Sequence, residues 1–185
     1  RRAADKAPAD VADVVRKTCA LLSPIADKRR VAIEIDAGTS EPPRAAGSAS
    51  APAFEALIDA AQIQQALTNL IVNGVQAMAP GGVLSVAVRR GPGAPVSRRG
   101  SAESTDAADR DCIRIDVEDH GEGMSPETIV RVFEPFFTTK PPGEGTGLGL
   151  AVAHEIVRGH GGWIAVRSKM GQGSCFSIFL PEDRA

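Results

Sequence analysis

The sequence predicts an α+β domain in which a mixed five-stranded sheet packs under three helices as a two-layer sandwich. Three observations support this prediction. Apolar residues recur at helical spacing in three stretches of the chain. Stretches that alternate between apolar and polar residues, as half-buried strands do, lie among them without a strict strand–helix–strand order. The chain has 185 residues, 43% of them hydrophobic, which suffices for one domain with its own core.

The first stretch with helical periodicity covers residues 10–29. We expect an interruption near Ser23-Pro24, because proline lacks the backbone donor that an α-helix needs. Residues 31–37 alternate and predict a strand. Residues 38–53 are rich in Ala, Ser, Pro and Gly, and we expect them to form a loop.

The second helix is predicted at residues 62–78, and Pro80-Gly81-Gly82 ends it. Residues 83–89 alternate as the next strand. Residues 91–111 are a low-complexity stretch of Gly, Pro, Ser and Arg, so they predict a flexible insert rather than a packed element.

The last third of the chain supplies three more strands and a helix. Residues 113–119 alternate strictly and predict a strand. Residues 146–160 have helical periodicity. Residues 163–168 and 174–180 form the two arms of a final hairpin around a glycine-containing turn.

The polar face of the second helix is unusual, because it consists only of amides. On a helical wheel these are Gln62, Gln65, Asn69, Asn73 and Gln76, and the opposite side carries Ile63, Leu67, Leu70, Gly74 and Met78. Amide oxygens suit a hard cation and amide N–H groups suit phosphate. A surface helix that happens to lack charge is the alternative.

Asp119 stands where the strand at 113–119 stops. A carboxylate there can accept a hydrogen bond from an exocyclic amine, such as the adenine N6 group. An Asp-led turn is the alternative. Further on, residues 132–140 (VFEPFFTTK) combine three phenylalanines with Lys140, a candidate phosphate contact.

Residues 143–150 (GEGTGLGL) are the most informative stretch of the chain. Glycines let backbone N–H groups approach a ligand closely, and a helix that begins just behind them adds unpaired amides and partial positive charge. This combination predicts a phosphate-binding site.

In this order, the segments resemble the four nucleotide-binding boxes of bacterial sensor histidine kinases. The matching motifs are Asn69–Asn73, Asp119-x-Gly121-x-Gly123, Phe133-Glu134-Pro135-Phe136-Phe137 and Gly145-Thr146-Gly147-Leu148-Gly149. The ATP-binding domain of these kinases belongs to the gyrase, heat-shock chaperone, kinase and mismatch-repair ATPase superfamily. The sequences of the third and fourth motifs look most like those of kinases of the nitrogen-regulation and dicarboxylate-sensing type.

The resemblance implies a division of the chain. Residues 1–8 would be a linker from an upstream dimerisation domain, residues 9–182 the catalytic ATP-binding domain, and residues 183–185 a tail. Within the domain, residues 124–145 would form a mobile lid over ATP, and residues 91–111 the flexible insert.

The resemblance also implies residue roles. Asn73 would be the Mg²⁺ ligand, and Asn73 and Lys140 the catalytic residues. ATP would be bound by Asn69, Asn73, Gln76, Asp119, Gly121, Gly123, Met124, Lys140, Gly145, Thr146, Gly147, Leu148, Gly149 and Ser174. Gly74 replaces the usual alanine after the Mg²⁺ ligand, and we expect a close packing contact there.

Position 69 bears on the mechanism. Hydrolysing members of the superfamily place a glutamate there to activate water, whereas Asn69 cannot accept a proton at neutral pH. The expected function is therefore transfer of the γ-phosphate of Mg·ATP to a histidine on a separate dimerisation domain of the same protein, which then serves a response regulator. His154 faintly resembles the phosphoacceptor motif, but it lies on the helix behind the phosphate loop and lacks the proline that normally follows, so we expect the acceptor on the separate domain.

Two alternatives stay open: a stand-alone ATPase or serine kinase of the same superfamily, and a non-catalytic nucleotide-sensing module. Composition excludes other classes. The net charge of −2 argues against a nucleic-acid surface. The chain has no apolar run long enough to span a bilayer. We expect a cytoplasmic, monomeric domain of a homodimeric parent protein, which could be anchored in the inner membrane.

Overall fold

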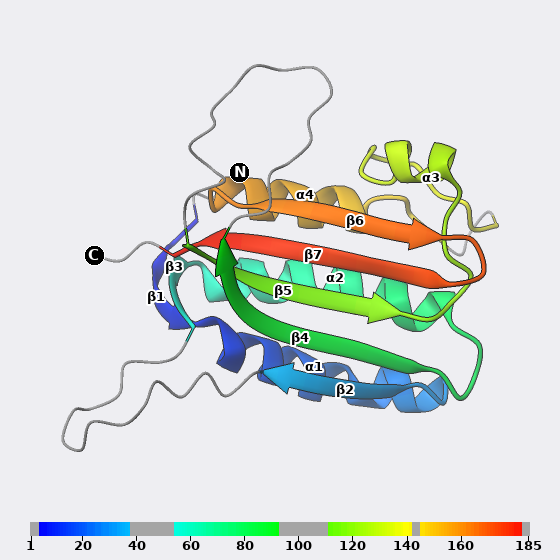
Figure 1. Ribbon diagram of the computed structural model, residues 1–185, viewed down its shortest axis with the longest axis horizontal. Coiled ribbons are helices and arrows are strands. Elements are labelled where there is room, and N and C mark those ends of the chain that lie inside the picture. The colour runs from blue at the N-terminus through cyan, green and yellow to red at the C-terminus, as the bar shows by residue number, and fades with distance from the viewer. Residues whose placement is uncertain (1–3, 38–53, 93–110, 142–144, 183–185) are drawn as a thin grey trace.

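The computed structural model describes residues 4–37, 54–92, 111–141 and 145–182. These residues form an α+β domain with a mixed five-stranded sheet and helices on one face of it, as predicted (Figure 1). Of the expected loop, insert and tail, residues 38–53, 93–110 and 183–185 lie outside the described part, as do residues 1–3 and 142–144.

The sheet has the strand order β2-β4-β5-β7-β6. Its strands are β2 (Ala32–Ala37), β4 (Val83–Pro92), β5 (Asp111–Asp119), β6 (Trp163–Lys169) and β7 (Gly173–Pro181). β2 pairs with β4 in parallel, and every other neighbouring pair is antiparallel. Because the sheet is mixed and only one face carries helices, the chain does not follow the βαβ scheme of a parallel sheet.

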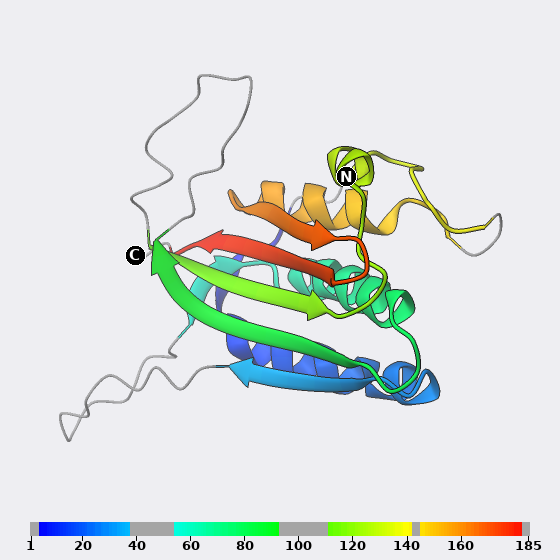
Figure 2. The same cartoon turned by 45° about the vertical axis from the view of Figure 1, so that its right-hand side comes forward.

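Three long helices cover the same face of the sheet (Figure 2). They are α1 (Val11–Lys28), α2 (Ala60–Ala77) and α4 (Gly149–Gly159). α2 lies in the middle and packs against both α1 and α4. The apolar side of α2 faces the sheet: Ile63, Leu67, Leu70, Gly74 and Met78 are all buried, as their spacing predicts.

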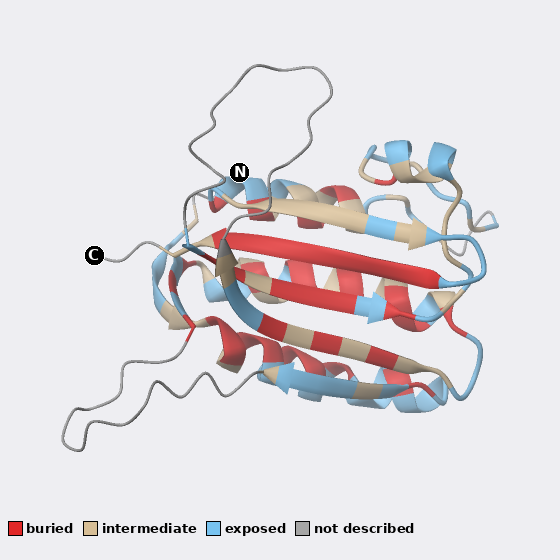
Figure 3. Ribbon diagram, in the orientation of Figure 1, coloured by how far each residue is buried: buried red, intermediate tan, exposed pale blue. Residues whose placement is uncertain are grey.

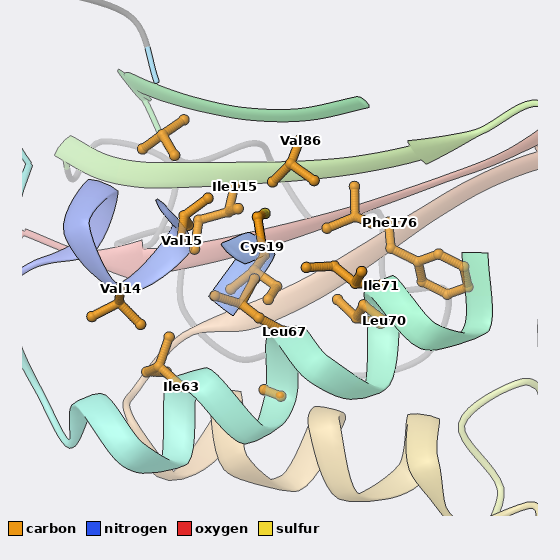
Figure 4. Close-up of a cluster of buried hydrophobic side chains, with 14 of the residues drawn as sticks. Val14, Val15, Cys19, Ile63, Leu67, Leu70, Ile71, Val86, Ile115 and Phe176 are labelled. Carbon is orange, nitrogen blue, oxygen red and sulfur yellow. The ribbon is translucent and has the colours of Figure 1, made fainter. Parts of the chain in front are cut away.

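The core lies between the sheet and the helices. β7 is buried along nearly its whole length, and the helix-facing residues of β4 and β5 are buried with it (Figure 3). Figure 4 shows Leu67, Leu70 and Ile71 of α2 pointing toward Val86, Ile115 and Phe176 of the sheet. Full burial of each such side chain stabilises the fold by about 1.5–3 kcal/mol, so this contact fixes α2 on the sheet.

The predicted interruption of the first helix is wrong. α1 continues through Pro24 to Lys28. Ala20 and Pro24 are exposed, so the Ala20 carbonyl that loses its helical partner can bind water instead. Leu22 and Ala26 are buried on the opposite side and keep the last turn on the core. Tertiary packing outweighs the local preference of proline here.

The structure contains three short elements that the sequence did not predict. β1 (Ala7–Asp10) and β3 (Glu55–Ile58) form a two-stranded antiparallel sheet, and α3 (Pro126–Arg131) is a short helix within residues 124–145. The two strands (APAD and EALI) do not alternate between apolar and polar residues, and the six residues of α3 make less than two helical turns. β1 begins two residues before the predicted domain boundary at residue 9.

The third helix also begins later than predicted. α4 starts at Gly149 instead of Thr146, because Gly147 has a φ of +64°, which no α-helix accommodates. Its end at Gly159 agrees with the prediction, and His160 forms the C-cap. No helix in the described ranges is both long and apolar enough to cross a membrane.

Candidate functional site

The amide face of α2 meets a cation from the segment at 132–140. The Nζ atom of Lys140 lies 3.5 Å from Oδ1 of Asn73 and donates a short hydrogen bond to Oε1 of Gln76. Asn69 and Asn73 are half-buried, whereas Gln76 is exposed. Two of the amide oxygens, those of Asn73 and Gln76, therefore face a positive charge.

Asp119 ends β5 beside the C-terminal half of α2 and is 4% exposed. Its Oδ1 atom accepts a hydrogen bond from the backbone N–H of Gly121 at 2.9 Å. Burial raises the pKa of the Asp119 carboxyl, and backbone N–H groups of Gly121 and Ser174 oppose that rise. The side chain is thus a buried acceptor in a short loop, held by two backbone donors.

The glycines after Asp119 allow the loop to lie against its neighbours. A Cβ atom on Gly121 would lie 2.3 Å from the carbonyl oxygen of Ala77, the last residue of α2. Gly123 has a φ of +65°, and a Cβ atom there would lie 2.0 Å from the carbonyl oxygen of Lys169. Any side chain at either position would push the loop away from α2 and β6.

Gly74 brings α2 close to the sheet under this site. A Cβ atom at this position would lie 2.6 Å from Cδ1 of Leu84 and 3.6 Å from Cβ of Asp119. This confirms the close packing contact that the sequence predicts. The contact sets the distance between the amide face of α2 and the buried carboxylate.

The start of α4 faces α2. Leu148 is the N-cap and makes no side-chain capping hydrogen bond, so the first N–H groups of the helix have no cap. A Cβ atom on Gly149 would lie 3.6 Å from Oδ1 of Asn69, which places the helix start beside the amide face. The N–H of Leu148 bonds only weakly to the Thr146 hydroxyl, at 3.4 Å.

The segment between α3 and α4 attaches to the body of the domain through Phe133. Its ring stacks on His154 of α4, with the centroids 4.9 Å apart, and meets Phe176 of β7 edge-on. Farther along, Phe136 is 75% exposed, and its N–H donates to the carbonyl of Gly147 at 2.9 Å. Gly145 lies against Thr138 and Lys140.

Sequence reasoning missed two polar side chains. Ser168 of β6 accepts a hydrogen bond from the N–H of Met124 at 2.8 Å and lies 3.0 Å from the hydroxyl of Ser174. His160, the last residue of the predicted helix at 146–160, also accepts a hydrogen bond at Nε2 from the N–H of Asp59 at 3.0 Å. Both contacts depend on strand register or on distant segments, so no local pattern could have identified them.

The described residues predicted to bind ATP gather at one end of the domain, on the right in Figure 1. They come from the second half of α2, the end of β5, the start of β7, the start of α4 and the segment before it. Among the described residues, no group of three or more His, Cys, Asp or Glu could hold a metal ion by itself.

Comparison with known proteins identifies the family. A family model described as "Histidine kinase-, DNA gyrase B-, and HSP90-like ATPase" matches residues 58–184. The sensor kinase CckA of Brucella abortus (strain 2308) is 39% identical over 123 residues, which are 66% of this chain and 13% of the relative. The sensor histidine kinase ZraS of Escherichia coli (strain K12) is 33% identical over 172 residues, 93% of this chain and 30% of the relative. The chain thus spans less than a third of either relative.

Solved structures share the fold. Full-length ShkA in complex with AMPPNP matches with a TM-score of 0.69 and 25% identity, covering 98% of this chain and 32% of that one. The catalytic domain of histidine kinase ThkA matches with a TM-score of 0.69 and 21% identity over 96% of both chains. The chain therefore belongs to the family of histidine kinase-, DNA gyrase B- and HSP90-like ATPases, and it is homologous to sensor histidine kinases of two-component systems.

Proposed function

We propose that this chain is the catalytic domain of a sensor histidine kinase, which binds Mg·ATP and transfers the γ-phosphate to a histidine on a separate dimerisation domain. One observation carries the proposal. A buried carboxylate acceptor, an amide face contacted by a lysine, and an uncapped helix start converge at one end of the domain. A purine amine, a metal and a triphosphate require these three kinds of group.

Each proposed contact follows from the chemistry of the side chain. Asp119 would accept a hydrogen bond from the adenine amine, and the Gly121 and Gly123 loop, packed against α2 and β6, would lie beside the base. The uncapped N–H groups at the start of α4 would bind phosphate oxygens. Lys140 would move its ammonium from the amide face to the phosphates as a point charge. The other residues proposed to bind ATP are Asn69, Gln76, Met124, Gly145, Thr146, Gly147, Leu148, Gly149 and Ser174.

The residues present fit a magnesium ion that is shared with phosphate. Asn73 and Gln76 direct their side-chain oxygens at the Lys140 ammonium, so this face accommodates positive charge. Asn73 would supply one oxygen ligand, and phosphate and water oxygens would supply the others. Bound Mg²⁺ would neutralise charge that develops on the transferred phosphoryl group.

Transfer is favoured over hydrolysis because α2 carries no carboxylate that could activate water. The helix contains no Asp or Glu between Ala60 and Ala77. Asn69 stands beside the start of α4, where a general base would be required, and an amide cannot take up a proton. Catalysis would then rest on positioning and electrostatic stabilisation.

The histidines of this chain support an acceptor elsewhere. His160 is 6% exposed and both of its ring nitrogens make hydrogen bonds. His154 stacks on Phe133, and His120 is an exposed residue of the loop that follows Asp119. The acceptor histidine, the dimerisation helices and the contact with a response regulator would belong to the rest of a longer, homodimeric protein.

Four finer assignments belong to the same proposal. Residues 1–8 would connect to the dimerisation domain, and residues 124–145 would act as the ATP lid. The domain would work in the cytoplasm, where ATP is available, whether or not the parent protein is anchored in the inner membrane. The motifs FEPFFTTK and GTGLGLAVAHEIV favour the nitrogen-regulation and dicarboxylate-sensing subfamily.

A calorimetric titration with AMPPNP, with and without Mg²⁺, tests the proposal together with a phosphate-release assay. We expect micromolar, Mg²⁺-sensitive binding and negligible phosphate release, with transfer appearing when a histidine-bearing dimerisation domain is added. Asn73→Asp should abolish binding, because the new carboxylate would pair with Lys140 and repel the triphosphate. Rapid phosphate release would instead indicate an ATPase, and no binding would indicate an interaction module.

A further inference from the structure

A hydroxyl without an assigned role lies next to the Asp119 loop. Ser168 accepts a hydrogen bond from the backbone N–H of Met124 at 2.8 Å and donates one to the carbonyl of Gly173 at 3.0 Å. The hydroxyl of Ser174 lies 3.0 Å from it. The strand register places Ser174 between the two: Ser168 is its partner on β6, and Asp119 is its partner on β5.

The hydrogen-bonding capacity of Ser168 determines the direction of its bond to Ser174. A serine hydroxyl has one hydrogen to donate and two lone pairs to accept with. The hydrogen of Ser168 goes to the Gly173 carbonyl, and one lone pair takes the Met124 N–H. The Gly173 carbonyl can only accept, so a Ser168 hydroxyl that donates to it has only a lone pair left for Ser174, and we assign Ser174 as the donor in this pair.

The Ser174 hydroxyl can therefore offer a ligand only the lone pairs of its oxygen. Its hydrogen is committed to Ser168, and the described residues offer its hydroxyl no other side-chain partner. Asp119, on the next strand, is also an acceptor, and both residues are more than nine-tenths buried. A ligand group beside Ser174 and Asp119 must therefore donate a hydrogen bond, because otherwise a buried acceptor would stay unpaired.

We propose that Ser168 is a positioning residue that sets base specificity: by fixing Ser174 as an acceptor, it makes the site select a 6-amino purine over a 6-oxo purine. This inference rests on the proposed function, since it requires that the base bind beside Asp119. A 6-oxo group would direct its lone pairs at those of Ser174. Without Ser168, the Ser174 hydroxyl could rotate and donate to that oxygen, so discrimination would weaken.

Competition between ATP and ITP in the presence of Mg²⁺ tests the inference. The two nucleotides differ at the edge of the purine: ATP has a 6-amino group, whereas ITP has a 6-oxo group and a proton on N1. We expect the wild-type chain to prefer ATP, and Ser168→Ala to reduce the ratio of the two affinities by about 3- to 10-fold, the range for one hydrogen bond. Ser174→Ala should reduce the ratio similarly, and the double variant should add little.

A matched control separates this role from general stabilisation of the loop. Ser85, a half-buried strand serine of β4 outside the site, should leave the ratio unchanged when replaced by alanine. If Ser168→Ala weakens ATP and ITP equally, Ser168 only supports the loop and the inference is wrong. If the wild-type chain binds neither nucleotide, the proposed function fails with it. Should the alanine variant not fold, Ser168→Cys, of similar size but weak in hydrogen bonding, must give the same shift.

Discussion

At the scale of single residues, Asp119 combines two opposed requirements. A buried carboxylate is unfavourable in its charged form, whereas an acceptor for a purine amine has to be buried and unprotonated. The structure meets both by supplying backbone donors from Gly121 and Ser174, which limit the rise in the pKa of the carboxyl that burial causes. The proposed adenine-binding position would thus also lower the stability of the domain when its carboxyl is charged.

Asp119→Asn should abolish ATP binding without unfolding the domain. The amide can still accept the hydrogen bond from the Gly121 N–H, but its NH₂ group would meet the adenine amine as donor against donor. Calorimetric titration with AMPPNP, and circular dichroism to confirm the fold, measure the two effects. Unchanged affinity in a folded variant would show that Asp119 does not contact the base.

The same variant allows a test of pH dependence. The pKa of Asp119 is raised on folding, so the folded protein binds this proton more tightly than the unfolded chain does. The contribution of Asp119 to stability is therefore greatest at low pH and is lost as the pH rises through its folded pKa. We expect Asp119→Asn to be the more stable protein at pH 7, and the difference in the free energy of unfolding to shrink as the pH falls below that folded value. Urea unfolding of both proteins at several pH values measures this difference in the free energy of unfolding. A difference that grows as the pH falls would contradict the raised pKa.

At the scale of elements, α2 is both the centre of the core and one wall of the site. Its apolar side packs on the sheet while its amide side faces Lys140. Gly74 lies on the apolar side, close to Leu84 of β4 and Asp119 of β5, which explains why a residue with poor helix propensity occurs in the middle of a helix. Close packing at that point replaces the local stability that alanine would give.

Gly74→Ala and Gly159→Ala should have opposite effects on stability. The new methyl at position 74 would lie 2.6 Å from Leu84, so Leu84 must shift, and overpacking of this kind costs about 1–3 kcal/mol. Nothing lies within 4 Å of a methyl at position 159, so replacing this helical glycine by alanine should raise the free energy of unfolding by about 0.5–1 kcal/mol. Thermal unfolding compares them. Equal stabilisation by both would show that α2 does not pack closely on β4.

The segment between α3 and α4 should behave as a lid. Residues Glu134, Pro135 and Phe136 are exposed, and Phe133 is the side chain that attaches the segment to α4 and β7. We expect fast amide hydrogen exchange across residues 134–141 without nucleotide and slower exchange with Mg·AMPPNP, because closure would order the segment. The exchange of buried β7 residues is the internal control. Strong protection of the lid residues in the free protein would rule out a mobile lid.

At the scale of the whole molecule, His160 connects elements that are distant in the sequence. It caps the end of α4, and its Nε2 atom accepts the N–H of Asp59, the N-cap residue of α2. Because Nε2 is an acceptor, the proton of the neutral ring is on Nδ1, which donates to the carbonyl of Ile156 at 2.8 Å. The two helices that flank the site are therefore joined at their far ends.

His160→Ala should destabilise the domain by about 1–3 kcal/mol, since a half-buried N–H of Asp59 loses its partner. His120→Ala, at an exposed loop position, should change the stability by less than about 0.5 kcal/mol. Urea unfolding of both variants measures the difference. Equal effects would mean that the link between α2 and α4 contributes nothing to the fold.

The sequence by itself determined the strands of the main sheet and the long helices, and it supplied the residues of the candidate site. Helical and strand periodicity located α2, α4 and the five strands of the main sheet, since each must bury one face. The amide face, Asp119, Lys140 and the glycine loop stood out because their residue types are unusual for a solvated surface or a simple turn. These signals are local, so they can be read along the chain.

Only the tertiary structure decided how those pieces meet. Helix α1 passes through Pro24 because its buried side holds the last turn in place. The pairing of β1 with β3, the Ser168–Ser174 contact and the link from His160 to Asp59 depend on strand register and on segments far apart in sequence. Hydrogen bonds between residues far apart in sequence produce no periodic pattern, because tertiary packing and not the neighbouring sequence brings their partners together.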